Sequence, residues 1–150
     1  MRALLIRRRT EKFQSGSERG FYVGGDEFLA GRRCLVLDDE YLIALDIQQI
    51  LESAGADGVI CVSTAREALD AIAGGAPFDV AVLDVKLDDK AGDSLEVAAA
   101  LGRTGTPFLF LTGMRSADVH AGKFPDTPVI EKPYQAPALV EAVRQTLTGR

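Results

Sequence analysis

Residues 78–87 read Phe-Asp-Val-Ala-Val-Leu-Asp-Val-Lys-Leu, an apolar run with a carboxylate, Asp84, close to its end. A short run of β-branched and aliphatic residues without polar alternation is typical of a parallel strand that is buried on both faces. Open α/β sheets bind their ligands in the crevice outside the carboxyl ends of such strands. The position of Asp84 therefore makes this carboxylate the first candidate for chemistry.

Length and composition suit one globular domain. The chain has 150 residues, of which 47% are hydrophobic, enough for a core of its own. No apolar segment approaches the roughly 20 residues of a membrane helix, and the N-terminus lacks a signal-peptide pattern. We therefore expect a cytoplasmic protein without a membrane partner.

Cys34 and Cys61 stand singly among aliphatic residues, which favours buried free thiols over a disulfide or a metal site.

Charge is unevenly distributed along the chain. The net charge is -5, but residues 1–31 hold six basic and four acidic residues, which leaves 11 basic and 18 acidic residues for the remainder. An acidic body argues against direct binding of nucleic acid, because phosphates are bound by clustered Lys and Arg.

Scattered Gly and Ser make residues 1–31 a flexible extension or linker, in which residues 4–13 could form a short helix. The folded domain is expected over residues 32–150.

Strand and helix patterns alternate from residue 32 onward. The expected strands cover residues 34–37, 59–62, 78–87, 107–112 and 128–130, and the expected helices cover residues 40–54, 64–73, 93–101 and 136–147, with a short one at 116–121. Gly55 is expected to end the first helix, and the Thr64 to Glu67 spacing predicts a capping box. Five such units with right-handed crossovers predict an α/β fold with a doubly wound parallel sheet.

Polar residues stand at or near the carboxyl ends of four of these strands. Asp38 and Asp39 follow the first strand, Asp84 ends the third, Thr112 ends the fourth and Lys132 follows the fifth. In a parallel sheet these positions share one edge, where three acids would raise one another's pKa unless a cation neutralised them. Mg²⁺ characteristically uses one or two carboxylates together with water and phosphate oxygens. Asp84 could then form an aspartyl phosphate, with Thr112 and Lys132 donating to the phosphoryl oxygens.

Four motifs resemble the signatures of the receiver domain of two-component response regulators: Leu37-Asp38-Asp39-Glu40, Val82-Leu83-Asp84, Leu111-Thr112-Gly113 and Glu131-Lys132-Pro133. The resemblance covers residues 32–150 and implies a flavodoxin-like, five-stranded parallel sheet with the order 2-1-3-4-5. It also implies a sensor histidine kinase or a histidine phosphotransfer protein as the phosphodonor. The downstream partner would be a further, unidentified protein.

The same resemblance implies a metal site and a phosphoryl acceptor. Asp38, Asp39 and Asp84 would hold Mg²⁺, and the backbone carbonyl of Lys86 would complete its protein ligands. Asp84 would accept the phosphoryl group.

Further roles come from the same comparison of motifs. Thr112 would be the switch hydroxyl, and Gly113 would leave the space that a phosphodonor needs. Lys132 would bind the phosphoryl group and would be joined to Pro133 by a cis peptide. Val129 stands where many receivers carry a Tyr or Phe, so the usual coupling of a threonine with an aromatic switch is not expected here.

Residues 107–113 resemble a Phe-x-Thr-Gly subgroup of stand-alone receivers. Together with the end of the sequence after the last expected helix, this predicts a single-domain regulator. It would be a phosphoacceptor rather than an enzyme, and would signal by binding partners or would drain phosphoryl groups from a shared kinase.

Other interpretations stay open beside this one. Asp38 and Asp39 alone would more often cap a helix than bind a metal, and His120 is expected to be a surface residue without a function. An aspartyl-phosphate phosphatase also uses an Asp at a strand end, but it normally requires an acid two residues later, where this chain has Lys86. A receiver-like binding module that is never phosphorylated is the third class.

Overall fold

The computed structural model describes residues 7–8, 27–85, 91–113 and 124–149. Its strands are β1 (Arg7–Arg8), β2 (Arg33–Leu37), β3 (Gly58–Val62), β4 (Val80–Val85), β5 (Phe108–Thr112) and β6 (Val129–Glu131). Its helices are α1 (Tyr41–Ser53), α2 (Ala65–Ala73), α3 (Ala91–Thr104) and α5 (Ala136–Thr148). The short helix expected at residues 116–121 and His120 lie outside the described residues.

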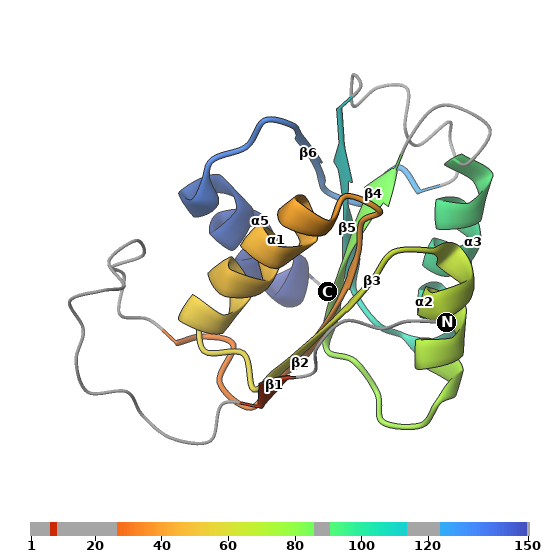
Figure 1. Cartoon of the computed structure of the whole chain (residues 1–150), viewed down its shortest axis with the longest axis horizontal. Coiled ribbons are helices and arrows are strands. Elements are labelled where there is room, and N and C mark those ends of the chain that lie inside the picture. The colour runs from red at the N-terminus through yellow and green to blue at the C-terminus, as the bar shows by residue number, and fades with distance from the viewer. Residues whose placement is uncertain (1–6, 9–26, 86–90, 114–123, 150) are drawn as a thin grey trace.

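The sheet has the order β1-β3-β2-β4-β5-β6. Strands β2 to β6 pair in parallel, which confirms the doubly wound α/β fold and the order 2-1-3-4-5 for these five strands. Helices α1 and α5 cover one face of the sheet, and α2 and α3 cover the other (Figure 1). The result is a three-layer sandwich with a hydrophobic core on each side of the sheet.

Strand β4 lies at the centre of the parallel sheet and is buried along its whole length, as its apolar sequence predicted. Val80 and Val82 belong to the core beneath α1 and α5, while Leu83 and Val85 belong to the core beneath α2 and α3. Because side chains alternate along a strand, Asp84 shares the face of Val80 and Val82. The strand thus delivers its carboxylate on the α1 side of the sheet.

The N-terminal segment differs from the expectation. Arg7 and Arg8 form β1, which pairs antiparallel with Val59 and Gly58 of β3, so the short helix expected over residues 4–13 is wrong at these two positions. Two basic residues carry no apolar periodicity that could predict a strand. They form one because the free edge of β3 pairs with their backbone. The parallel sheet therefore carries a sixth, antiparallel strand.

Residues 27–31 also contact the folded domain, although they precede the expected boundary at residue 32. Leu29 is completely buried in the core shared with α1 and α5, and its N–H donates to the carbonyl of Ala54 at 2.9 Å. The guanidinium of Arg144 on α5 lies 4.3 Å from the centre of the Phe28 ring. These contacts join the segment to both helices of this face.

Gly55 allows this close approach. It follows α1 with φ of 104°, a conformation that favours glycine, and so ends the helix as predicted. A Cβ at Gly55 would lie 2.8 Å from the Cβ of Glu27. The residue therefore serves both the helix end and the packing of residues 27–31.

Two smaller expectations are confirmed, one for the start of α2 and one for the cysteines. The Thr64 hydroxyl accepts the Glu67 N–H at 3.1 Å, and the Glu67 carboxylate accepts the N–H of Ser63, the residue before the N-cap, at 2.9 Å. Both side chains therefore cap the start of α2, as their spacing predicted. Cys34 and Cys61 are free and buried, and burial raises the pKa of each thiol to about 12. No helix in the described part of the chain is long and apolar enough to cross a membrane.

Candidate functional site

Four strands place their polar residues at one edge of the sheet. Asp38 directly follows β2, Asp84 lies near the end of β4, Thr112 ends β5 and Lys132 directly follows β6. Two backbone hydrogen bonds extend the strand pairing to this edge. The Asp38 N–H donates to the carbonyl of Val62 at 3.1 Å, and the Lys132 N–H donates to the carbonyl of Thr112 at 2.7 Å.

Three carboxylates gather there. Asp38, Asp39 and Asp84 each offer one oxygen, and these oxygens lie within 4.8 Å of one another. Asp38 and Asp84 are buried, with relative exposures of 2% and 6%, while Asp39 is exposed. A partly buried, oxygen-only donor set of this charge fits a hard divalent cation such as Mg²⁺. Lys86, whose carbonyl was expected to join this set, lies outside the described residues.

The ammonium of Lys132 lies among the acids. Its Nζ is 3.0 Å from Oδ1 of Asp84 and 3.2 Å from Oδ2 of Asp38. A third carboxylate, that of Glu40, is 3.7 Å away. The sequence motif included Glu40 but assigned it no role, because its contact with Lys132 joins residues that are distant in the chain.

Burial and charge act against each other at this site. Burial raises the pKa of Asp38 and outweighs both the hydrogen bond from the Glu40 N–H and the attraction of Lys132, which lower it. Burial lowers the pKa of Lys132, but the hydrogen bond to Asp84 and the charge of Asp38 outweigh it, so the net change is upward. One ammonium therefore stays charged but does not fully compensate the acids, which leaves a negative cleft that attracts a cation.

A hydroxyl on α3 also supports the acceptor position. The Ser94 hydroxyl donates to the backbone carbonyl of Asp84 at 2.8 Å, and the Ser94 side chain is buried. The sequence indicated a helix start near residue 93 but not this bond, which depends on how α3 packs against β4. The bond ties the end of β4 to a neighbouring helix and so fixes the backbone of Asp84.

Thr112 and Gly113 occupy the positions that the motif requires. Thr112 is completely buried at the end of β5, whereas Gly113 is exposed. No described atom lies within 4 Å of the place where a Cβ of Gly113 would be, so the described residues leave this approach open. The peptide between Lys132 and Pro133 is cis, as expected.

Val129 lies in β6 and packs with the core beneath α2 and α3. The aromatic residues of that core lie outside β6: Phe110 on β5 pairs with Val129, and Phe124 makes edge-to-face contacts with Phe108 and Phe110, with ring centres 5.7 and 5.9 Å apart. A valine at position 129 is thus a packed core residue rather than a rotating aromatic side chain.

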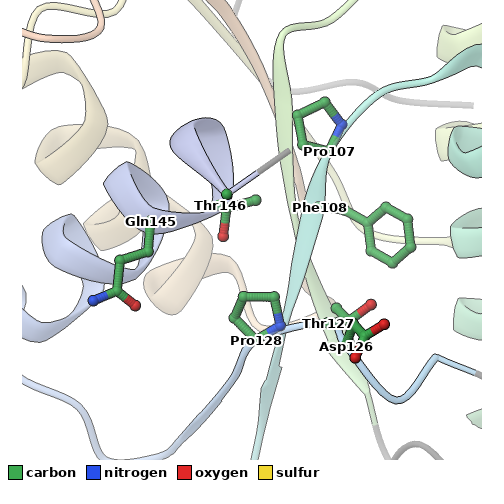
Figure 2. Close-up of a pocket in the computed structure, with 8 residues that line it drawn as sticks. Pro107, Phe108, Asp126, Thr127, Pro128, Gln145 and Thr146 are labelled. Carbon is green, nitrogen blue, oxygen red and sulfur yellow. The ribbon is translucent and has the colours of Figure 1, made fainter.

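A cavity of about 310 Å³ lies away from this site, between the start of β5, the residues before β6 and the end of α5. Figure 2 shows Pro107, Phe108 and Pro128 lining it together with Thr146. Pro107, Phe108 and Pro128 stand at the amino ends of β5 and β6, whereas the acids stand at the carboxyl ends of the strands. The cavity is therefore separate from the acidic site.

Comparisons with known proteins agree with the geometry. The family model of the response regulator receiver domain matches residues 34–144. No curated protein matches the chain.

Several solved structures are similar to the chain. A response regulator receiver protein from Sinorhizobium medicae WSM419 has 27% sequence identity and a TM-score of 0.66, and the match covers 77% of this chain and 94% of that one. A CheY-like response regulator receiver domain protein from Methanospirillum hungatei JF-1 has 30% identity and a TM-score of 0.65, with coverages of 79% and 94%. The BeF3-activated receiver domain of DrrB has 25% identity and a TM-score of 0.63, with coverages of 77% and 97%.

Proposed function

This chain belongs to the response regulator receiver domain family, and on that basis we propose that Asp84 accepts a phosphoryl group in a Mg²⁺-dependent reaction. The observation that carries the proposal is the placement of Asp84. Its carboxylate lies within 3.0 Å of the Lys132 ammonium and within 4.8 Å of the oxygens of two further acids.

The reaction begins with a carboxylate oxygen of Asp84 as nucleophile. This oxygen forms a bond to phosphorus while the bond from phosphorus to the donor breaks, and the donor leaves with that electron pair. For a histidine donor, the leaving atom is an imidazole nitrogen. Mg²⁺ held by Asp38, Asp39 and Asp84 would supply positive charge opposite the phosphoryl oxygens.

Lys132 then has a new set of acceptors. Its ammonium contacts the carboxylates of Asp38 and Asp84 before transfer, and the transferred group brings oxygens with greater charge to the same place. A charge-assisted hydrogen bond from Lys132 to a phosphoryl oxygen stabilises the product. The Thr112 hydroxyl is the second donor that we assign to this group.

As a signalling protein, the chain would accept its phosphoryl group from a sensor histidine kinase or a histidine phosphotransfer protein in the cytoplasm. The only reactions that it would catalyse are its own phosphorylation and dephosphorylation. Its output would be binding of a downstream protein, or removal of phosphoryl groups from a shared kinase. We also assign it to the stand-alone receivers of the Phe-x-Thr-Gly type, on the sequence of residues 107–113.

An aspartyl-phosphate phosphatase is the second candidate, since it shares the nucleophile. Lys86 stands where that mechanism needs a general acid, which disfavours it. A receiver-like module that is never phosphorylated is disfavoured by the buried charges of Asp38, Asp84 and Lys132. Burial of charged groups lowers the stability of the fold, and a module without phosphoryl chemistry would gain nothing from them.

Phosphoryl transfer from purified kinases of the source organism tests the proposal. With Mg²⁺ present, we expect label to pass from the autophosphorylated kinase to the parent chain and not to the Asp84→Asn variant. Labelling of both the parent and Asp84→Asn would contradict the proposed function. So would the absence of label on the parent after incubation with each kinase and each phosphotransfer protein.

A further inference from the structure

We infer that Glu40 is a positioning residue for Lys132. The Glu40 carboxylate competes with the incoming phosphoryl group for the Lys132 ammonium. This inference rests on the function proposed above and concerns the same site. It adds a residue that belongs neither to the three clustered acids nor to the phosphoryl-binding pair, Thr112 and Lys132.

The side chain of Glu40 does not cap the helix that follows it. Glu40 is the N-cap of α1, and its side chain makes no capping hydrogen bond. Ser, Thr, Asp and Asn are the preferred residues there, because a short side chain reaches the free N–H groups of the first turn. The Glu40 N–H is itself bound by Oδ1 of Asp38 at 2.9 Å. The backbone of Glu40 is therefore fixed, while its carboxylate extends to Lys132 at 3.7 Å.

The three carboxylates around Lys132 differ in what they can do next. The Asp38 and Asp84 side chains are 1% and 5% exposed and belong to the candidate metal cluster, whereas the Glu40 side chain is 57% exposed and does not. A cation held by the cluster would neutralise Asp38 and Asp84 and so would weaken their attraction for the ammonium. Glu40 would keep its charge and would then be the acid that holds Lys132.

Phosphoryl oxygens must then draw the ammonium away from Glu40. An exposed ion pair of this kind typically contributes about 0.2–1 kcal/mol. The upper half of that range corresponds to about a two- to fivefold change in an equilibrium constant. We therefore expect Glu40→Gln to bind a phosphoryl mimic about two- to fivefold more tightly than the parent chain.

Beryllofluoride in the presence of saturating Mg²⁺ is the probe. Its affinity would be measured from the amide shifts of Thr112 and Gly113 for the parent, for Glu40→Gln and for Glu96→Gln. Glu96 is an exposed acid on α3 and is not among the acids that contact Lys132, so this control makes the same charge change without touching the ammonium. Mg²⁺ affinity and the urea midpoint of unfolding would be measured for the same three proteins.

We expect Glu40→Gln, but not Glu96→Gln, to bind beryllofluoride more tightly than the parent. This gain in affinity should shrink at high salt, because salt screens an exposed ion pair. Equal or weaker binding than the parent overturns the inference. So does a gain that only follows a change in Mg²⁺ affinity or that also occurs in Glu96→Gln. Failure of the parent itself to bind beryllofluoride overturns the proposed function together with this inference, whereas the other outcomes leave the proposed function intact.

Discussion

At the scale of single residues, Asp38 shows what the site demands of its side chains. It is buried beside other acids, and burial raises its pKa despite the Lys132 ammonium at 3.2 Å. A carboxyl group with a higher pKa in the folded than in the unfolded protein binds its proton more tightly when folded. Stability then falls as pH rises from its usual value of 3.8 through the folded value.

Asp38→Asn should therefore be more stable than the parent at pH 7 without Mg²⁺, by roughly 1 kcal/mol, a common size for a single-site change. The amide oxygen can still accept the Glu40 N–H, and Lys132 keeps Asp84 and Glu40 as partners. The difference should shrink as the pH is lowered toward 3.8, because Asp38 then becomes neutral. Urea denaturation of both proteins across this pH range measures it.

Added Mg²⁺ supplies the control for this prediction, since a bound cation stabilises the parent through Asp38 and the variant much less. An Asp38→Asn variant that is less stable than the parent at every pH would show that the ion pair with Lys132, rather than burial, dominates the electrostatics of Asp38.

At the scale of elements, the sequence predicted what periodicity controls and missed what the packing of distant segments controls. The apolar run of β4 and its final acid identified the central strand, and the Thr64 to Glu67 spacing identified the start of α2. In contrast, β1 consists of two arginines that only the edge of β3 orders. The Ser94 bond to Asp84 and the Glu40 contact with Lys132 likewise arise from tertiary packing.

Residues 27–31 provide the clearest test at this scale, because Leu29 is completely buried. Leu29→Ala should lower the free energy of unfolding by about 2–5 kcal/mol, the usual cost of this truncation in a core. Leu42→Ala makes the same chemical change on α1 at a side chain that is 74% exposed, and should stay within about 0.5 kcal/mol of the parent. Denaturant unfolding of the three proteins compares them.

Equal stability of Leu29→Ala and Leu42→Ala would mean that residues 27–31 add nothing to the core in solution. In that case the folded domain would begin at residue 32, as the sequence alone predicted.

At the scale of the whole molecule, β5 and β6 connect the acidic edge to the remainder of the fold. The Thr112 carbonyl accepts the Lys132 N–H, so movement of Thr112 toward a phosphoryl group is passed directly to the residues after β6. Val129 offers no aromatic rotamer to carry the signal. We expect the backbone from Thr112 to Gly113 and the paired β6 to carry it instead, a small loop rearrangement of a kind known in switches.

Thr112→Val should therefore still be phosphorylated on Asp84, but should lose most of the associated change in residues 124–135. Replacing the hydroxyl by a methyl group leaves a side chain of similar size but removes the donor that would reach the phosphoryl oxygen. Amide shifts of residues 124–135 with and without beryllofluoride measure the response. Identical shift changes in the parent and the variant would exclude this route and favour direct recognition of the phosphorylated cleft by a partner.

The central claim is that Asp84 forms an acyl phosphate in a site that needs a divalent cation. The most direct test is intact-mass spectrometry of the parent and Asp84→Asn after incubation with acetyl phosphate, with Mg²⁺ or with EDTA, and followed by hydroxylamine. We predict one added phosphoryl group on the parent with Mg²⁺ only, complete removal by hydroxylamine, and no addition to Asp84→Asn. A phosphoryl group that forms in EDTA, resists hydroxylamine or appears on Asp84→Asn would contradict the claim.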